Sequence, residues 1–451
     1  MYSEKVNALI SELDAEIKNH PAIGAELFEE LTAAQHELGL LHDTRPICPF
    51  LRPHFLSRKQ YQSIKRASEV LASAFERLTE VALEDDQLLA KFDLTEKEER
   101  MARINPGYKS LCVTSRLDSF LCDDGLKFLE YNAETPAGVG DQIQFQKILM
   151  RVPPVREFIE KNKTWIPSPH HALLENLVAA YRECGGKEEH PQIAIVDWKG
   201  VSTESEFRIL QEYFESRGCK TIIADPHELD FNGEHLYADG FRIDIFYKRV
   251  IIHEFFDEFD DTHPLIQAYK AQKVCMANSF RPKIVHKKSS FAVLSDTQYT
   301  HLFTDEQKEV IRRHIPWTRR LEESRTTFEN EEYDLLELLR KHREKFLLKP
   351  NDDYGGKGIT IGWETNQADW EHALNEALTH SYVVQERAPI HKTKIPMFDD
   401  KLEFAEMHID FNPYVFSSGV EGALVRLSPS SLVNVTQGGG ETGLVVLDGV
   451  D

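Results

Sequence analysis

The chain has 451 residues, of which 41% are hydrophobic and 28% charged, and its formal net charge is −22. These proportions are typical of a soluble globular protein large enough for two or three domains. No apolar run approaches the roughly 20 residues needed to span a bilayer, which excludes a membrane protein of helical type. The acidic excess argues against a nucleic-acid partner, because phosphate binding requires basic patches.

The six cysteines are scattered without a C-x-x-C pair, which indicates reduced thiols rather than a disulfide framework or a zinc site. The N-terminus has no apolar segment of the kind found in secretion signals. We therefore expect a cytoplasmic protein.

Residues 1–108 are expected to form a helical region. Apolar residues recur at helical spacing from Val6 to Ile17, a second helix begins near Pro21, and a third covers residues 57–83. Residues 109–190 are expected to hold a β-hairpin followed by helices at 142–152 and 170–184.

Residues 191–276 are expected to form an α/β domain. Short buried strands at 193–196 and 221–224 flank a helix at 204–217, which predicts a βαβ unit with parallel strands. A longer strand is expected at 243–252.

Residues 277–451 are expected to form a further α/β part. The predicted elements are helices at 305–314, 332–343 and 369–378, and strands at 345–349, 359–361, 382–386, 404–416 and 423–427.

The hairpin of the second part is predicted to carry a polar face. Two apolar runs, 117–122 and 126–131, flank Asp123-Asp124-Gly125, a three-residue loop with glycine at the left-handed position. The register that this loop sets opposes Arg116 and Asn132, Asp118 and Glu130, Phe120 and Phe128, and Cys122 and Leu126.

One arginine, two carboxylates and an amide then converge on one face of the hairpin. A divalent cation bound by oxygen ligands would account for such a face. An ordinary cross-strand salt bridge accounts for the spacing equally well, since exposed charge pairs are common and contribute little.

A glycine-rich loop lies late in the chain. Lys349 and Pro350 end an apolar strand, and Gly355, Gly356 and Gly358 precede the next strand. Glycines let backbone N–H groups approach phosphates closely. The loop is not a Walker A motif, because a strand rather than a helix follows it. Taken alone it also fits a hairpin turn.

The order strand, Lys-Pro, acidic pair, Gly-Gly-x-Gly, strand, helix and strand ending in Gln385-Glu386 resembles the ATP-grasp superfamily. The resemblance implies that Lys349 and Lys288 hold the phosphates of ATP, with Lys287 as the rival of Lys288. It also implies that Gly355, Gly356 and Gly358 form the loop over the phosphates, and that Gln385, Glu386 and Ala388 grip the adenine.

The hairpin sequence R-x-D, then E-x-N followed by T-P-x-G, resembles the closing motif of ATP-grasp ligases of the D-alanine–D-alanine ligase kind. This implies that Asp118, Glu130 and Asn132 bind Mg²⁺ and that Arg116 stabilises the transferring phosphoryl group. The motif precedes the lysines and the glycine loop here. This inverted order is typical of circularly permuted members, which include glutathione synthetase and glutathionylspermidine synthetase-like ligases.

The resemblance extends to the last part of the chain. By analogy with glutathione synthetase, Arg426 is expected to meet a substrate carboxylate, and Gly438, Gly439 and Gly440 to close over the site. Asp353, by its register from Lys349, is the favoured metal ligand of the glycine loop, with Asp352 left as the alternative. Asp410 is a candidate for contact with substrate.

The predicted fold is therefore α/β (α+β), a circularly permuted ATP-grasp fold with an N-terminal helical region and an inserted βαβ domain. The resemblance implies an ATP- and Mg²⁺-dependent ligase that joins a small-molecule carboxylate to an amine through an acyl phosphate. An ATP-grasp phosphotransferase and a non-catalytic nucleotide-binding protein are the alternatives. The identity of both substrates, and whether the protein forms a homo-oligomer, are left open.

Overall fold

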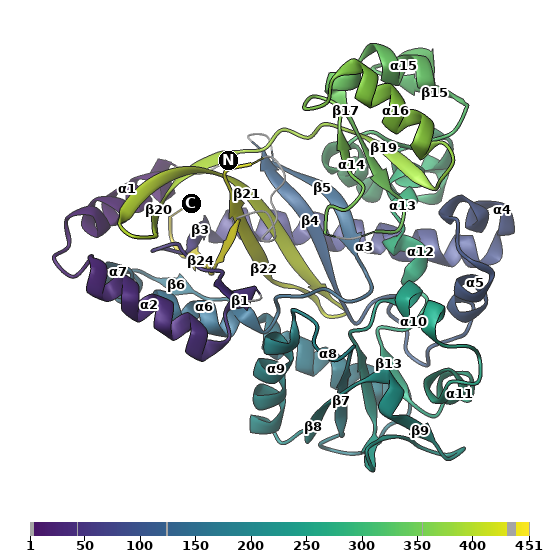
Figure 1. Cartoon of the computed structure of the whole chain (residues 1–451), viewed down its shortest axis with the longest axis horizontal. Helices are drawn as coiled ribbons and strands as arrows, with labels where there is room; N and C mark the ends of the chain where they lie inside the picture. Colours follow the sequence, from purple (N-terminus) through teal and green to yellow (C-terminus); the bar gives the residue numbers. More distant parts are fainter. Residues whose placement is uncertain (1–3, 43, 123–124, 354, 431–438, 451) are drawn as a thin grey trace.

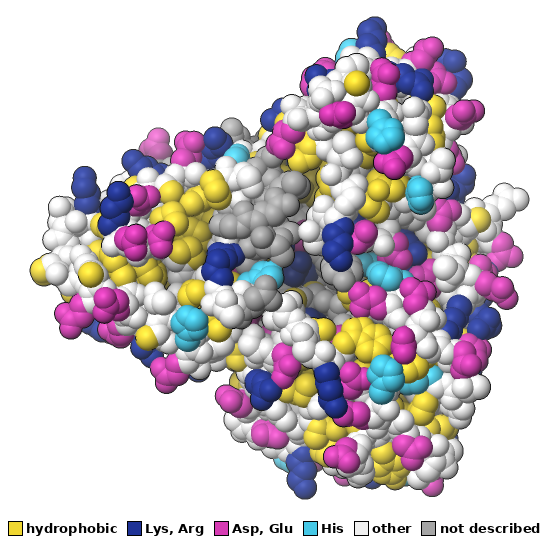
Figure 2. All heavy atoms as spheres, in the orientation of Figure 1, with side chains coloured by type: hydrophobic (Ala, Val, Ile, Leu, Met, Phe, Trp, Pro, Cys, Tyr) yellow, Lys and Arg dark blue, Asp and Glu magenta, His cyan; other side chains and the backbone are white. Residues whose placement is uncertain are grey.

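The computed structural model describes residues 4–42, 44–122, 125–353, 355–430 and 439–450. It is a mixed α/β protein in which helices pack on several separate sheets, as expected (Figure 1). On the face shown in Figure 2, acidic and basic side chains are interspersed over all parts of the molecule. No helix within the described ranges is long and apolar enough to cross a membrane.

The largest sheet lies at the centre of the molecule and has the order β23-β22-β21-β4-β5 (Figure 1). Its strands are β4 (Thr114–Cys122), β5 (Gly125–Asn132), β21 (Leu402–Phe416), β22 (Gly419–Ser428) and β23 (Gly440–Thr442), and β20 (Lys392–Phe398) pairs with the first half of β21. All neighbouring strands are antiparallel. Strands from the second and the last part of the chain thus form one sheet.

Helix α3 (Arg58–Glu84) packs against β21 and β22 of this sheet. Its start is fixed by a capping box, in which the Ser57 side chain accepts the N–H of Gln60 and the Gln60 side chain accepts the N–H of Ser57. Leu71, Leu78 and other apolar residues at helical spacing are fully buried against the sheet. The predicted helix at 57–83 is confirmed.

The N-terminal part is helical, as predicted, but it also contributes strands. Its elements are α1 (Glu4–Asn19), α2 (Ala25–Leu38), α4 (Asp86–Leu89), the 3-10 helix η1 (Ala90–Phe92), α5 (Glu96–Ala102), β1 (Leu41–His42), β2 (Arg45–Pro46) and β3 (His54–Ser57). Strand β3 pairs in parallel with β24 (Leu444–Leu447), which pairs antiparallel with β6 (Thr164–Trp165). The N-terminal part of the chain and its last described strand therefore share a sheet.

The α/β part contains a parallel sheet with the order β13-β12-β7-β8. The predicted strands β7 (Ile193–Val196) and β8 (Thr221–Ala224) and the helix α9 (Glu204–Ser216) are confirmed, and β7 and β8 are parallel. The sheet is completed by β12 (Ile245–Lys248) and β13 (Cys275–Ala277).

The single strand predicted at 243–252 is wrong. Strand β12 ends at Lys248, and helix α10 (Ile252–Glu258) begins at the end of the predicted range. The buried Lys248 ammonium donates a hydrogen bond to the carbonyl oxygen of Val250 at 3.2 Å. The chain turns at this point to satisfy a charge inside the protein, and an apolar pattern does not reveal such a turn.

Asn278, directly after β13, connects this sheet to the hairpin. Its side-chain amide donates to the carbonyl oxygens of Thr114 and Ala133 at 2.6 and 2.8 Å, and its carbonyl accepts the N–H of Val113 at 2.7 Å. All these atoms are buried, so the hairpin is held at a fixed position on the α/β part.

A separate lobe carries the glycine loop and contains the sheet β14-β19-β17-β18 (top right in Figure 1). Its strands are β14 (Thr318–Arg320), β17 (Phe346–Pro350), β18 (Thr360–Ile361) and β19 (Tyr382–Glu386), and helices α15 (Leu335–Lys341) and α16 (Gln367–Ala377) belong to it. The fully buried Trp370 packs with Leu339 and Leu348 in the core of this lobe.

The helix predicted at 332–343 starts too early. Residues 331–334 form strand β16 (Glu331–Asp334), which pairs with β15 (Arg325–Phe328), and α15 begins only at Leu335. The Asp334 side chain caps this helix by accepting the N–H of Glu337 at 3.0 Å. The helix predicted at 305–314, α14 (Asp305–His314), is confirmed.

The remaining elements connect these parts. They are α6 (Asp141–Leu149), α7 (Pro153–Lys161), α8 (Pro169–Glu183), α11 (Pro264–Lys270), α12 (Lys283–His286), α13 (Ser289–Leu294), β9 (Leu229–Phe231), β10 (Leu236–Ala238), β11 (Phe241–Ile243) and the 3-10 helices η2 (Pro226–Glu228), η3 (Thr297–Leu302) and η4 (Arg343–Lys345).

Candidate active site

The inner half of the hairpin has the predicted register. Arg116 lies opposite Asn132 and Asp118 opposite Glu130, so the four polar side chains share one face of the sheet. The outer half differs, because a bulge follows Asp118 and shifts the pairing by one residue. Phe120 therefore pairs with Lys127 and Cys122 with Gly125, not with Phe128 and Leu126, while Asp123 and Asp124 lie outside the described residues.

Two arginines and two aspartates meet on this face. Arg116 forms a bidentate ion pair with Asp118, with Nε–Oδ1 and Nη2–Oδ2 distances of 2.7 and 3.0 Å. Arg426 of β22 donates to Asp118 Oδ2 at 2.9 Å and to Asp410 Oδ2 at 2.8 Å. We call Arg116, Asp118, Asp410 and Arg426 the pocket cluster.

The two aspartates of the pocket cluster have opposite electrostatic properties. Burial alone would raise the pKa of Asp118, but the charges of Arg116 and Arg426 lower it to about 2. Burial raises the pKa of Asp410 to about 6, because Arg426 offsets the desolvation only in part and Asp118 adds a like charge. Asp410 Oδ1 is buried and has no hydrogen-bond partner. It is therefore an acceptor open to a ligand or to a proton.

The two predicted nucleotide lysines approach the hairpin from the other side. The Lys349 ammonium donates to Gln385 Oε1 at 2.8 Å and lies 3.4 Å from the carbonyl oxygen of Leu129. Burial lowers its pKa to about 8, with Lys288 adding to the effect and Glu130 opposing it. The Lys288 ammonium donates to the carbonyl oxygen of Asp353 at 2.6 Å and lies 3.6 Å from Glu130 Oε1.

A cavity of about 520 Å³ lies between these groups, a size that suits a small-molecule ligand. The predicted site residues that line it are Arg116, Asp118, Glu130, Asn132, Lys349, Gly355, Gly356, Gln385, Glu386, Ala388, Asp410 and Arg426. The hairpin and the lobe with the glycine loop, which are far apart in the sequence, thus form two walls of one cavity.

Five other predicted residues within the described ranges do not line this cavity: Lys288, Asp353, Gly358, Gly439 and Gly440. A Cβ at Gly358 would lie 2.6 Å from Pro350 Cγ, and one at Gly440 would lie 2.7 Å from Pro49 Cδ. Close packing is thus sufficient to explain these two glycines. The Gly439 carbonyl oxygen accepts a hydrogen bond from Arg45 at 3.0 Å, and Gly438 lies outside the described residues.

Sequence reasoning missed the apolar walls of the cavity. Leu347, Ile359, Ile361 and Trp363 line it from the glycine-loop lobe, and Phe120 and Leu129 line it from the hairpin. The guanidinium carbon of Arg387, another lining residue, lies 4.5 Å from the centre of the Trp363 ring. Alternation along 359–363 was a usable signal, since every second residue there is large and apolar and faces the cavity.

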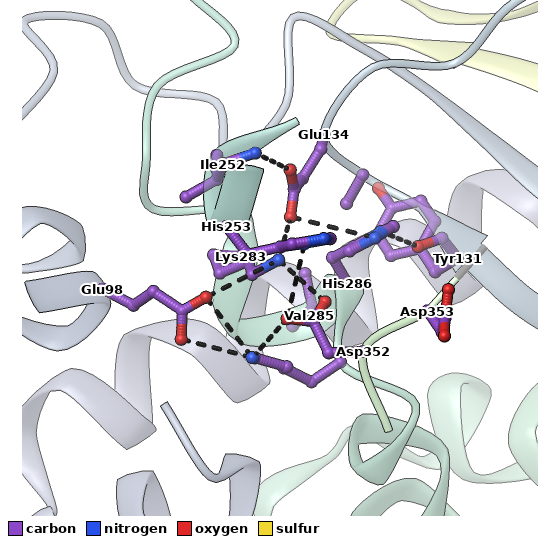
Figure 3. Close-up of polar contacts among 12 residues, drawn as sticks. Glu98, Tyr131, Glu134, Ile252, His253, Lys283, Val285, His286, Asp352 and Asp353 are labelled. Carbon is purple, nitrogen blue, oxygen red and sulfur yellow. Dashed lines mark hydrogen bonds and ion pairs between the residues drawn. The ribbon is translucent and has the colours of Figure 1, made fainter. Parts of the chain in front are cut away.

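The contacts of Asp352 and Lys287 bear on two choices that the sequence leaves open, Asp352 or Asp353 as metal ligand and Lys287 or Lys288 as nucleotide lysine. Asp352 is engaged by two ammonium groups, with distances of 2.7 Å from Oδ1 to Lys283 Nζ and 2.6 Å from Oδ2 to Lys287 Nζ. Figure 3 shows the Asp353 side chain apart from these contacts. Asp352 and Lys287 are thus ion-paired with each other, and the choice of Asp353 and Lys288 for a nucleotide and its metal stays a prediction.

No family model and no curated protein matches the chain. Among solved structures, the chain is similar to a glutathione synthetase-like effector from Globodera pallida. The TM-score is 0.58 at 14% identity, and the match covers 93% of this chain and 96% of that one. A protein described as a "putative gamma-glutamylcysteine synthetase" from Methylobacillus flagellatus matches with a TM-score of 0.42 at 11% identity, over 84% of this chain and 85% of that one. The first match shows a fold shared over nearly the whole chain, so the relation to glutathione synthetase-like proteins is confirmed at the level of the fold.

Proposed function

We propose that the protein is an ATP- and Mg²⁺-dependent carboxylate–amine ligase with a circularly permuted ATP-grasp fold. The observation that carries the proposal is the shared cavity, in which the arginine and oxygen ligands of the hairpin face the lysine and glycine loop of the separate lobe. The division into parts at residues 1–108, 109–190, 191–276 and 277–451 belongs to this proposal.

The cavity has the chemistry that a nucleotide requires. Its apolar walls, with Leu347, Ile361 and Trp363 on one side, suit an adenine ring. Lys349 and the N–H groups of Gly355 and Gly356 supply positive charge and hydrogen-bond donors for phosphates. Gln385, Glu386 and Ala388 also line the cavity and would contact the adenine ring.

The donors on the hairpin fit a magnesium ion. Asp118, Glu130 and Asn132 offer only oxygen ligands from carboxylates and an amide, which is the set that Mg²⁺ prefers. Asp118 stays ionised because Arg116 and Arg426 hold the pKa of its carboxyl at about 2, and a bound ion would share its two oxygens with these arginines. Asp353 would complete the set from the glycine-loop side. When bound, Mg²⁺ would neutralise phosphate charge and orient the γ-phosphoryl group.

In the proposed reaction a substrate carboxylate oxygen bonds to the γ-phosphorus as the bond to the β–γ bridging oxygen breaks, and ADP leaves with that electron pair. The amine nitrogen then attacks the acyl carbon, and phosphate leaves with the bonding pair. Arg116 and Arg426 stabilise the charge on the transferring group and the acyl phosphate. Asp410 Oδ1 accepts the proton that the amine loses, since a pKa of about 6 suits a general base.

The test is product analysis with the purified chain. ATP and Mg²⁺ are offered with a panel of carboxylates and amines, and both phosphate release and amide formation are measured. A ligase releases phosphate only when carboxylate and amine are both present and yields one amide for each phosphate.

Two outcomes would contradict the proposal. A lasting phosphorylated product formed without an amine would identify a phosphotransferase. Tight ATP binding with no turnover across the panel would identify a nucleotide-binding protein without this activity. The carboxylate and amine partners are part of the proposal, and the panel identifies their chemical class.

A further inference from the structure

A second group of charged side chains lies beneath the glycine loop, outside the cavity. Its members come from four distant segments and are Glu98 of α5, Glu134 after β5, Lys283 of α12, Lys287 directly after α12, and Asp352 after β17. We call these five residues the buried cluster. Figure 3 shows the side chains of Glu98, Glu134, Lys283 and Asp352 pointing toward one another.

Lys283 is at the centre of this cluster. Its ammonium lies 2.7 Å from Glu134 Oε1, 2.7 Å from Asp352 Oδ1 and 3.6 Å from Glu98 Oε1 (Figure 3). Lys287 lies 2.6 Å from Asp352 Oδ2 and 3.2 Å from Glu98 Oε2. Two ammonium groups thus cross-link three carboxylates.

The cluster is withdrawn from solvent. The side chain of Lys283 is 0% exposed, and those of Glu98 and Glu134 are 2% exposed. Burial disfavours the charged forms of Lys283 and Glu134, but the opposite charges beside them outweigh this effect. The pKa of Lys283 is therefore raised, and that of Glu134 is lowered to about 2. Each charge inside the protein therefore depends on the others.

A metal site is the first alternative for this cluster. Ligand atoms of Glu134, His286 and Asp352 lie within 4.8 Å of one another, a spacing that would suit a cation. The Lys283 ammonium, however, is already bonded to both Glu134 and Asp352. The protein thus supplies its own cation at this point.

The position of the cluster in the sequence links it to the proposed site. Glu134 follows the predicted metal ligand Asn132 by two residues, and its Oε2 accepts the N–H of Ile252 at 3.0 Å. Asp352 is the neighbour of Asp353. Lys287 is the neighbour of Lys288, whose backbone N–H donates to the carbonyl oxygen of Asn351 at 2.9 Å. Three segments of the site are therefore anchored to one buried ion-pair network.

We propose that Lys283 is a positioning residue, whose ammonium holds the segments of Glu134 and Asp352 together so that Asn132, Lys288 and Asp353 converge on one nucleotide and its metal. This inference rests on the proposed function. It predicts that Lys283 controls nucleotide and Mg²⁺ affinity without touching either ligand.

Lys283→Met removes the central charge and keeps the length of the side chain, but it leaves three buried carboxylates with one lysine. The double variant Lys283→Met/Glu134→Gln removes Lys283 together with the carboxylate that has no other lysine partner in the cluster, and leaves Lys287 paired with Asp352 and Glu98, which guards against loss of folding. The matched control is Lys308→Met, which removes an exposed lysine paired with Asp305 on α14. Folding is checked by circular dichroism and Tm, and ATP binding by calorimetry across a Mg²⁺ titration.

We expect the double variant to fold with a Tm close to that of the unmodified protein. Its ATP affinity should be about 10–100-fold weaker, and the Mg²⁺ concentration for half-maximal binding higher by a similar factor, as when a supporting contact of a metal site is lost. Lys308→Met should change neither.

A folded double variant with unchanged ATP and Mg²⁺ affinity would overturn the proposal, because the cluster would then only stabilise the fold. Absence of ATP binding by the unmodified protein would overturn the proposed function, and this inference with it. The two failures are distinguished by the unmodified protein alone.

Discussion

The pocket cluster and the buried cluster contain the same kinds of side chain, but they differ in what their charges are bonded to. In the buried cluster every carboxylate has a lysine within 2.6 to 3.2 Å. In the pocket cluster Asp410 Oδ1 has no hydrogen-bond partner, and all four residues line the cavity. Glu134 Oε1 of the buried cluster also has no hydrogen bond, but it lies 2.7 Å from the Lys283 ammonium and does not line the cavity.

This difference separates a structural role from a binding role. In a closed ion-pair network the charged groups neutralise one another, and the network acts by fixing the backbone segments that carry it. A network that borders a cavity and retains an unpaired acceptor is prepared for a ligand. The comparison predicts that removing a charge harms mainly stability in one cluster and mainly activity in the other.

The largest expected effect on stability is that of Lys283→Met. Removing one partner of a buried ion pair costs roughly 3–5 kcal/mol of unfolding free energy, because the carboxylates left behind are unpaired inside the protein. Urea denaturation measures this. The exposed control Lys308→Met should stay within about 0.5 kcal/mol of the unmodified protein. An unchanged urea midpoint for Lys283→Met would show that the cluster is not energetically coupled.

Arg116→Ala should reduce catalytic turnover more than stability. Turnover should fall by about 10²–10³-fold, as when an oxyanion donor is removed. The loss of stability should be smaller than that of Lys283→Met, because Asp118 keeps Arg426 at 2.9 Å. Steady-state kinetics and urea denaturation on the same samples test both statements, with Arg312→Ala, an exposed arginine paired with Glu309, as the control. Full turnover in Arg116→Ala would refute its catalytic assignment.

The sequence was a good guide to the pocket cluster and a poor one to the buried cluster, for a physical reason. The pairing of Asp118 with Glu130 follows from the alternation of side chains along a hairpin, which is a local rule. Strands β7, β8 and β19 were predicted at their observed bounds, since each is a short apolar run between turn signals.

No local rule brings Glu98, Glu134, Lys283 and Asp352 together. Nothing in the neighbouring sequence of each residue identifies its partners, and their contacts depend on how four separate segments pack. Long-range charge pairing is thus what the sequence pattern does not reveal. Lys248 is a different case, since its buried ammonium donates to the carbonyl oxygen of Val250, two residues away, where the strand has ended but the apolar pattern continues to residue 252.

Glu441 of β23 extends the pocket cluster, since it lies opposite Arg426 in the sheet and its Oε2 has no hydrogen-bond partner. Burial raises its pKa from 4.5 to about 7. Because the unfolded chain loses this proton first, the folded protein loses stability as the pH rises from about 4.5 to about 7. A glutamine at this position does not titrate, so the protein would not lose stability in this way as the pH rises.

Glu441→Gln should therefore gain stability over the unmodified protein by about 1–3 kcal/mol more at about pH 8 than at about pH 5. Urea denaturation at the two pH values measures this difference. A gain that is equal at both values would mean that Glu441 does not carry a strained charge, and the pocket cluster would then be as fully paired as the buried one.

The smallest expected effect concerns the glycine loop, which follows Asp352 of the buried cluster in the sequence and contributes Gly355 and Gly356 to the cavity lined by the pocket cluster. Gly355 has a φ of +67°, and among the described residues a Cβ there would have no heavy atom within 4 Å. Gly185 is the matched control, because it has a φ of +88°, equally open surroundings among the described residues and no part in the lining of the cavity. Alanine at either position should cost about 1 kcal/mol of stability from backbone strain alone.

Only Gly355→Ala should weaken ATP binding, by roughly two- to fivefold, because strain of about 0.5–1 kcal/mol would then oppose the loop conformation over the phosphates. Equal ATP affinity in the two variants would place the loop outside the nucleotide site and leave the pocket cluster as the only ligand-facing group of the pair.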